Sequence, residues 1–133
     1  MTKEFQKRIE SLESIFQFLD EFSAANDIPQ AVTLKLGFIA EEIFTNRIKY
    51  NPQNNQNISI SLELAGSEVR ICFSDFEDKA FDITKTKPLN TDSPLEERRG
   101  GGMGLHLVKR MANKLEYKHE NGKATITAVK NLE

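Results

Sequence analysis

The sequence predicts a two-layer α+β sandwich, in which a mixed, mostly antiparallel sheet is covered on one face by about three helices. Two observations support this fold class. Apolar residues recur at helical spacing in three segments, and they alternate in two pairs of short segments joined by turn-forming residues. The 133 residues, 38% of them hydrophobic, supply one core, so we expect a single domain over residues 1–133.

The first part of the chain predicts two amphipathic helices. Residues 3–9 are compatible with an edge strand or with the lead into the first helix. Apolar spacings of three and four predict a helix from Ser11, as its N-cap, to about Ala25. A second helix, with Val32, Leu36, Ile39 and Ile43 on one face, is expected to reach about Lys49. A turn-forming polar run follows it.

The middle of the chain predicts a β-hairpin. Apolar and polar residues alternate strictly from Ile58 to Leu64. The alternation resumes from Val69 to Phe73 after a turn at Gly66, and the second strand ends near Asp75. A strand end is a place where a side chain of a functional site can emerge from a rigid element.

The last part of the chain predicts a long connection, a helix and another hairpin. Residues 76–101 have little periodicity and exceed the usual length of a loop, so we interpret them as a mobile lid. A third helix is expected from about Gly102. Strands at 115–119 and 124–129 are then expected to pair about a turn at residues 121–122.

The composition excludes several classes of function. The net charge of -2 comes from acids and bases mixed along the chain, so neither a nucleic acid nor a membrane is expected as a direct partner. Cys72 is the only cysteine, which excludes an internal disulfide, and its apolar surroundings predict a buried, inert thiol. The N-terminus has no apolar signal region, and no stretch is long enough to span a bilayer. We therefore expect a cytoplasmic protein.

Glu42 and Asn46 are the first candidate site residues. Their four-residue spacing places both side chains on the same face of the second helix, one turn apart. An amide oxygen is a hard ligand that suits Mg2+, and a carboxylate one turn away can orient or deprotonate an attacking hydroxyl. The alternative is an ordinary helix with a solvated face, because a pattern with two fixed positions is not specific.

A glycine-rich run is the second candidate. Glycines let backbone amides approach phosphate oxygens, and a helix N-terminus adds positive potential. The preceding pair, Arg98 and Arg99, can also reach phosphate oxygens. The alternatives are a flexible linker and a charged surface, and the spacing matches neither the Rossmann nor the Walker pattern. The run consists of Gly100, Gly101, Gly102, Met103, Gly104 and Leu105.

Asp75 is the third candidate. A carboxylate at a strand end can accept a hydrogen bond from an exocyclic amine and so select adenine. The alternative is an aspartate that initiates a turn.

Taken together and in this order, the three segments resemble the ATP-binding domain of the GHKL superfamily, with its Bergerat fold. Its members include gyrases, heat-shock chaperones, histidine kinases and mismatch-repair ATPases. The N box of that superfamily resembles EEIFTNRIKY, its adenine-binding aspartate follows a hairpin as Asp75 does, and its second glycine box resembles RRGGGMGLHLVKRMAN. The small size and the segment GGGMGLHLVKRMAN are most similar to the anti-sigma-factor serine/threonine kinases.

This resemblance implies a kinase that uses ATP and Mg2+. Glu42 would be the catalytic base, Asn46 the Mg2+ ligand and Asp75 the adenine-binding residue, with Gly102 and Gly104 near the phosphates. The substrate would be a serine or threonine of an anti-anti-sigma protein. Members of that family also bind a sigma factor and are commonly homodimers, and both properties come from the resemblance alone.

The sequence departs from the superfamily's pattern around Asp75. The first glycine box usually has the form D-x-G-x-x-F, whereas Glu77 occupies the glycine position here and Phe81 comes one position late. A glutamate there adds a side chain and a negative charge, so weaker or altered nucleotide binding is expected. Arg47 also follows Asn46 where a small residue is usual, and it either crowds the site or reaches a phosphate.

Two alternatives to such a kinase stay open. One is a catalytically inactive module with the same fold that sequesters a protein partner. The other is a detached catalytic domain of a histidine kinase, which is less favoured. His106 and His119 are the only histidines, and the sequence has no dimerisation helix that carries a phosphoacceptor histidine.

Overall fold

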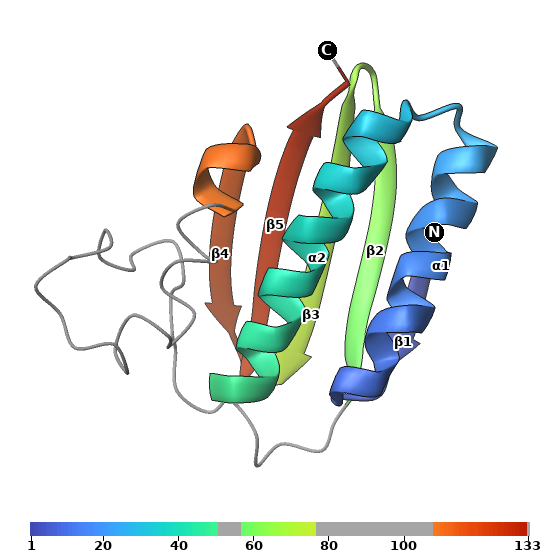
Figure 1. Ribbon diagram of the computed structural model, residues 1–133. Coiled ribbons are helices and arrows are strands. Elements are labelled where there is room, and N and C mark those ends of the chain that lie inside the picture. The colour runs from blue at the N-terminus through green and yellow to red at the C-terminus, as the bar shows by residue number, and fades with distance from the viewer. Residues whose placement is uncertain (51–56, 77–107, 133) are drawn as a thin grey trace, which may run out of the picture.

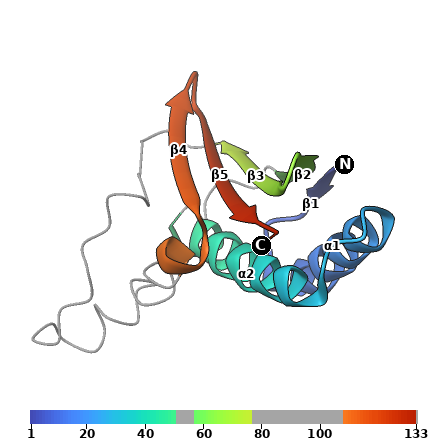
Figure 2. The ribbon, with the colours of Figure 1, turned by 90° about the horizontal axis from the view of Figure 1, so that it is seen from above.

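The computed structural model describes residues 1–50, 57–76 and 108–132. Within these ranges, five strands form one sheet, and two long helices lie across one face of it (Figure 1). Seen from above, the sheet and the helices form two layers (Figure 2). The predicted α+β sandwich is therefore confirmed. Every described strand pair is antiparallel, so the sheet is more regular than the mixed sheet we expected.

The N-terminal segment forms an edge strand, which was one of its two interpretations. Strand β1 (Thr2–Phe5) pairs with β2, and a 3-10 helix (η1, Ile9–Ser11) leads into α1 (Leu12–Ala25). Ser11 has helical backbone angles, and its side chain makes no capping bond. Its Oγ donates instead to the carbonyl oxygen of Gln6 at 2.7 Å. The prediction that Ser11 caps α1 is wrong because the chain is already helical before that helix begins.

Helix α2 (Gln30–Tyr50) and the first hairpin follow the predicted pattern. Strands β2 (Ile58–Ala65) and β3 (Glu68–Phe76) pair over seven residue pairs. Gly66 in the turn has a φ of 62°, a left-handed conformation that glycine adopts without steric cost. No helix in the described part of the chain, α2 included, is long and apolar enough to cross a membrane.

The C-terminal hairpin is also present. Strands β4 (Lys114–Glu120) and β5 (Lys123–Asn131) pair about a turn in which Asn121 and Gly122 have positive φ. The strand order β1-β2-β3-β5-β4 places β5 between β3 and β4. Strand β3 therefore has β2 on one side and β5 on the other, in the interior of the sheet.

Residues 108–111 are helical, and Val108 is buried in the core. This agrees with the third helix, whose start was expected near Gly102. The expected start of this helix lies outside the described residues. The predicted lid after Phe76 and the polar run at 51–56 lie outside them too.

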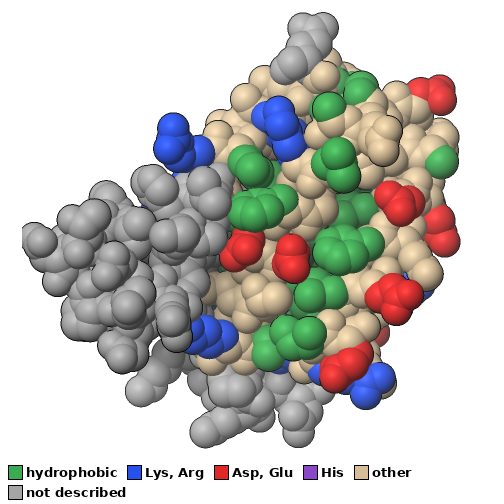
Figure 3. All heavy atoms as spheres, viewed as in Figure 1, with side chains coloured by type: hydrophobic (Ala, Val, Ile, Leu, Met, Phe, Trp, Pro, Cys, Tyr) green, Lys and Arg blue, Asp and Glu red, His purple; other side chains and the backbone are tan. Residues whose placement is uncertain are grey.

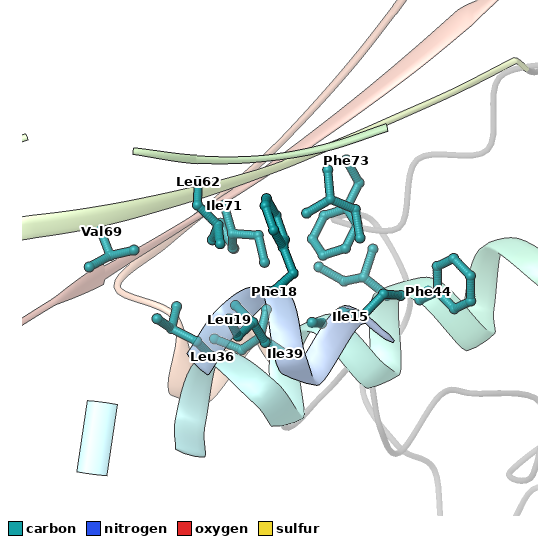
Figure 4. Packing of buried hydrophobic residues seen from close by; sticks show 14 of the residues in the cluster. Ile15, Phe18, Leu19, Leu36, Ile39, Phe44, Leu62, Val69, Ile71 and Phe73 are labelled. Atoms are coloured by element: carbon teal, nitrogen blue, oxygen red, sulfur yellow. The ribbon is translucent and has the colours of Figure 1, made fainter. Parts of the chain in front are cut away.

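The core fills the space between the inner face of the sheet and the helices (Figure 4). Alternate residues of β2 and β3 point inward, and α1 and α2 each supply one apolar face. Burying one such side chain stabilises the fold by about 1.5–3 kcal/mol. The contributing residues include Ile15, Leu19, Leu36, Ile39, Ile43, Ile60, Leu62, Ile71 and Phe73, all of them 2% exposed or less.

The opposite face of the sheet is polar. Cys72 lies on this face and is half-buried. Thr127 Oγ1 donates a hydrogen bond to the Cys72 Sγ at 3.5 Å. The prediction of a buried thiol is wrong because Ile71 and Phe73 take the inner face of β3, and alternation then turns Cys72 outward.

The outer surface of the helical layer carries an apolar groove between α1 and α2 (Figure 3). The groove has a volume of about 430 Å³. Two of its lining side chains, Phe16 and Leu34, are 37% and 68% exposed. Asp20 and Glu41 also line it, so an apolar floor is combined with acidic groups. We call it the α1–α2 groove.

Leu36 and Leu34 of α2 differ in burial, so replacing each one tests how the helix is oriented against the core. Leu36→Ala should lower the free energy of unfolding by about 2–5 kcal/mol, because it leaves a cavity in a close-packed interior. Leu34 is 68% exposed, so Leu34→Ala on the same helix should change it by less than about 0.5 kcal/mol. Urea unfolding followed by circular dichroism measures both. Equal losses in the two variants would contradict the orientation of α2.

Candidate functional site

The buried face of α2 continues past its apolar residues into polar ones. Ile39, Ile43 and Arg47 are spaced four residues apart, so they lie on the same side of the helix, and all three are fully buried. Asn46 is buried beside them, with 3% of its surface exposed. The apolar packing of α2 thus carries two polar side chains of its last turns into the interior.

Glu42 lies one turn before Asn46 and is half-buried. Burial is the larger cause of a raised pKa for the Glu42 carboxyl, and the negative charge of the adjacent Glu41 raises it further. A carboxyl with a raised pKa is a stronger base once it is ionised. This side chain therefore has the property that a proton acceptor at a functional site requires.

The amide group of Asn46 is buried and has no hydrogen-bond partner in the described part of the chain. Neither Oδ1 nor Nδ2 finds one among the described residues. A buried polar group that lacks a partner costs free energy, and such groups are rare in folded proteins. This side chain is therefore suited to contact a ligand.

Asp75 lies within β3 rather than beyond it. The residue pairs with Ala124 of β5 and continues the inward alternation of Ile71 and Phe73, with 2% of its surface exposed. The alternative that Asp75 initiates a turn is wrong, because the strand continues to Phe76. The carboxylate is thereby placed on the same side of the sheet as α2.

Two cationic side chains contact the Asp75 carboxylate. Arg47 Nε donates a hydrogen bond to Oδ2 at 3.2 Å, and Lys7 Nζ forms an ion pair with Oδ1 at 2.7 Å. The side chains of Lys7, Arg47 and Asp75 are 4%, 0% and 2% exposed. We call these three side chains the Asp75 ion cluster. Arg47 thus contacts the aspartate of the expected adenine site, a role that we did not assign to it from the sequence.

The Asp75 ion cluster joins three segments that are distant in the sequence. Lys7 belongs to the link between β1 and η1, Arg47 to α2, and Asp75 to β3. Removing such charges from water costs several kcal/mol per ion, so the cluster depends on opposite charges staying in contact. It therefore holds the N-terminal segment, the helix and the sheet in one arrangement.

A family comparison identifies the domain. Residues 5–130 match the model of the histidine kinase-like ATPase domain. The chain belongs to this family. The superfamily recognised from the sequence motifs is thereby confirmed, and the antiparallel sheet with helices on one face is the fold expected for it.

Two solved structures have the same fold. The crystal structure of the RsbU and RsbW domains of a Mycobacterium tuberculosis protein is 13% identical, with a TM-score of 0.69 over 98% of this chain and 32% of that chain. A chain of the SiaB-SiaC complex from Pseudomonas aeruginosa is 14% identical, with a TM-score of 0.68 over 97% of this chain and 88% of that chain. This chain thus spans about a third of the mycobacterial chain. No curated protein matches the sequence.

The described residues can be compared with the needs of a bound Mg2+ ion. The orphaned amide of Asn46 offers an oxygen to a hard cation such as Mg2+. Within residues 1–50, 57–76 and 108–132, His, Cys, Asp and Glu side chains form no group of three or more that could hold a metal ion. A single amide ligand is compatible with Mg2+, which usually keeps several waters and binds substrate phosphates.

The structure describes some of the predicted site residues and not others. Glu42 and Asn46 lie on α2, and Asp75 lies on the inner face of β3. Glu77, which replaces the expected glycine, is outside the described residues. The same holds for the phosphate-binding candidates, namely Arg98, Arg99, Gly100, Gly101, Gly102, Met103, Gly104 and Leu105.

The pairing of Arg47 with Asp75 was not predicted from the sequence, although a signal for it exists. Arg47 stands four residues after Ile43 on the buried face of α2, and Asp75 stands two residues after Phe73 on the inner face of β3. Opposite charges at two inward positions indicate a buried pair, because an isolated buried charge is costly. For Lys7 the sequence contains no such signal, since the segment around it has no clear period.

The Asp75 ion cluster predicts a large loss of stability in Asp75→Asn. The variant removes the carboxylate that two buried cations contact, so the free energy of unfolding should fall by about 3–5 kcal/mol. Glu116→Gln is the matched control, because it breaks a fully exposed ion pair with Lys114 and should leave stability unchanged. Urea unfolding of both variants measures this. Two equally stable variants would contradict the role of the cluster.

The raised pKa of Glu42 can be measured directly. Glu42 should take up its proton at a higher pH than an ordinary glutamate when the pH is lowered. Glu41→Gln removes the like charge, so the pKa should fall toward its usual value but stay above it, since burial is the larger cause. Carbon-13 NMR titration of the glutamate carboxyls gives both values. Glu21→Gln, an exposed change on α1, should have no effect, and a pKa unchanged by Glu41→Gln would contradict the assigned cause.

Proposed function

We propose that this protein is an ATP-dependent serine/threonine kinase of the anti-sigma-factor type, which phosphorylates an anti-anti-sigma partner. The observation that carries the proposal is the pair on α2. Asn46 has a buried amide without a partner among the described residues, and one turn earlier Glu42 has a raised pKa. A ligand site and a proton acceptor thus lie side by side in a family of histidine kinase-like ATPase domains.

Glu42 is the proposed catalytic base. It accepts the proton of a serine or threonine hydroxyl while the oxygen of that hydroxyl bonds to the γ-phosphorus and the bond to ADP breaks. Partial burial supports this role, because a carboxylate shielded from water is a better proton acceptor. The half-exposed position also leaves room for a substrate side chain to approach.

Asn46 is the proposed Mg2+ ligand, and Asp75 is the proposed contact for adenine. When bound, Mg2+ neutralises charge on the phosphates of ATP during transfer. We assign the phosphates to the glycine run at 100–104, with Met103 and Leu105 beside it, and to Arg98 and Arg99. This assignment rests on the residue types, since backbone amides at a helix N-terminus and guanidinium groups bind anions.

The fold comparisons support a protein partner. One neighbour was solved as the SiaB-SiaC complex, and the other structure contains RsbU and RsbW domains. On that basis we assign protein partners to this chain, namely an anti-anti-sigma protein as substrate and a sigma factor as a second partner. A homodimer and a cytoplasmic location belong to the same proposal.

Two variants of α2 separate binding from transfer. Glu42→Ala should bind Mg-ATP as the wild type does but lose phosphoryl transfer by at least about 100-fold, because the base contributes only to the chemical step. Asn46→Ala should weaken Mg-ATP binding, because it removes a metal ligand. Calorimetry measures binding, and labelled ATP with a candidate partner measures transfer. Wild-type transfer by Glu42→Ala would refute the assigned role.

A second candidate function is a binding module that sequesters a protein without turnover. The α1–α2 groove favours it, because exposed apolar side chains beside acidic groups suit a partner with apolar and basic residues. The engagement of Asp75 by two cations also favours it. Thermal unfolding with millimolar Mg-ATP distinguishes the two candidates. A ligand that binds the native state must raise the unfolding temperature, so no shift would favour the binding module.

A further inference from the structure

We propose that Lys7 lowers the affinity of the nucleotide site for adenine. Its ammonium occupies the side of the Asp75 carboxylate that a base must reach, while Arg47 contacts the other oxygen. The inference rests on the proposed ATP site. It assigns an effect on nucleotide specificity to Lys7, a residue of the N-terminal segment that lies outside the motifs of the sequence.

The carboxylate of Asp75 is already engaged at both oxygens. The Lys7 ammonium lies 2.7 Å from Oδ1, and Arg47 Nε donates to Oδ2 at 3.2 Å. An adenine amino group is a neutral donor, and its hydrogen bond to a carboxylate is strong only while the negative charge is available. Two cations in contact neutralise that charge, so the amino group gains less from Asp75.

The burial of the cluster adds a steric reason. Asp75 is 2% exposed, so a base can contact its carboxylate only if a neighbouring side chain moves. Arg47 is fixed within α2 and is fully buried. Lys7 belongs to the short link between β1 and η1, and its chain neighbours, Gln6 and Arg8, are exposed. Of these two described partners, Lys7 is therefore the one that yields to the base.

The displacement of Lys7 couples the site to the N-terminal segment. Lys7 is two residues after the end of β1 and two residues before η1. If adenine binding releases Lys7 from Asp75, then a ligand or partner that holds Lys7 away from Asp75 raises the affinity for adenine. Adenine binding then raises the affinity for that ligand or partner by the same factor. The β1–η1 link thus becomes a point at which nucleotide affinity is regulated.

The test measures binding of two nucleotides by calorimetry. ATP carries the 6-amino group, whereas purine riboside triphosphate lacks it but keeps the sugar and phosphates. Lys7→Met removes the ammonium and keeps the apolar stem, so Asp75 stays paired with Arg47. Lys7→Gln is the second variant, in case the first does not fold. Lys3→Met, which removes an exposed lysine from the same N-terminal segment, is the matched control.

We expect Lys7→Met to bind ATP about tenfold more tightly, the factor that corresponds to one hydrogen bond of ordinary strength. Its affinity for purine riboside triphosphate should not change, and Lys3→Met should behave as the wild type. If the affinity for ATP is unchanged, or rises equally for both nucleotides, the inference is wrong although the ATP site stands. If neither the wild type nor either Lys7 variant binds ATP, the proposed function itself fails, and the inference fails with it.

Discussion

The packing of α2 against the inner face of the sheet gives every described site residue its position. The helix contacts β3 and β5, and its apolar side chains such as Leu36 and Ile43 are fully buried. Since the helix is rigid, burial of these residues also carries Asn46 and Arg47 into the interior. The alternation of β3 brings Asp75 to the same layer. The polar site is thus positioned by the same apolar contacts that stabilise the fold.

The buried polar groups on α2 and on β3 differ in the contacts that they make. On α2, the buried amide of Asn46 has no hydrogen-bond partner among the described residues. On β3, the carboxylate of Asp75 is in contact with Lys7 and Arg47. The two buried polar groups therefore differ, since the amide lacks a described partner and the carboxylate contacts two cations. If the proposed ATP site is correct, this contrast affects the base-contacting side of the site more than the metal-binding side.

The same features suit a protein that responds to partners. The α1–α2 groove exposes apolar side chains on the outer surface of the helical layer, whereas the Asp75 ion cluster lies beneath α2, on the side of the sheet. Lys7 links that cluster to the short segment that precedes α1, the helix that forms one wall of the groove. Under our proposals, a partner on α1 and a nucleotide at Asp75 would act on α1 and on the β1–η1 link, which are close together in the sequence. Such coupling is a free energy shared between two sites and requires no long pathway.

The sequence by itself determined the elements, their order, the superfamily and the spacing of Glu42 and Asn46. Helical and strand periods, turn residues and glycine runs are local properties, so they can be inferred without knowledge of distant neighbours. The sequence did not determine what surrounds Asp75. Its contacts with Lys7 and Arg47 arise only when the core brings three distant segments together. Ion pairing depends on distance and burial in space, and neither is set by local spacing along the chain.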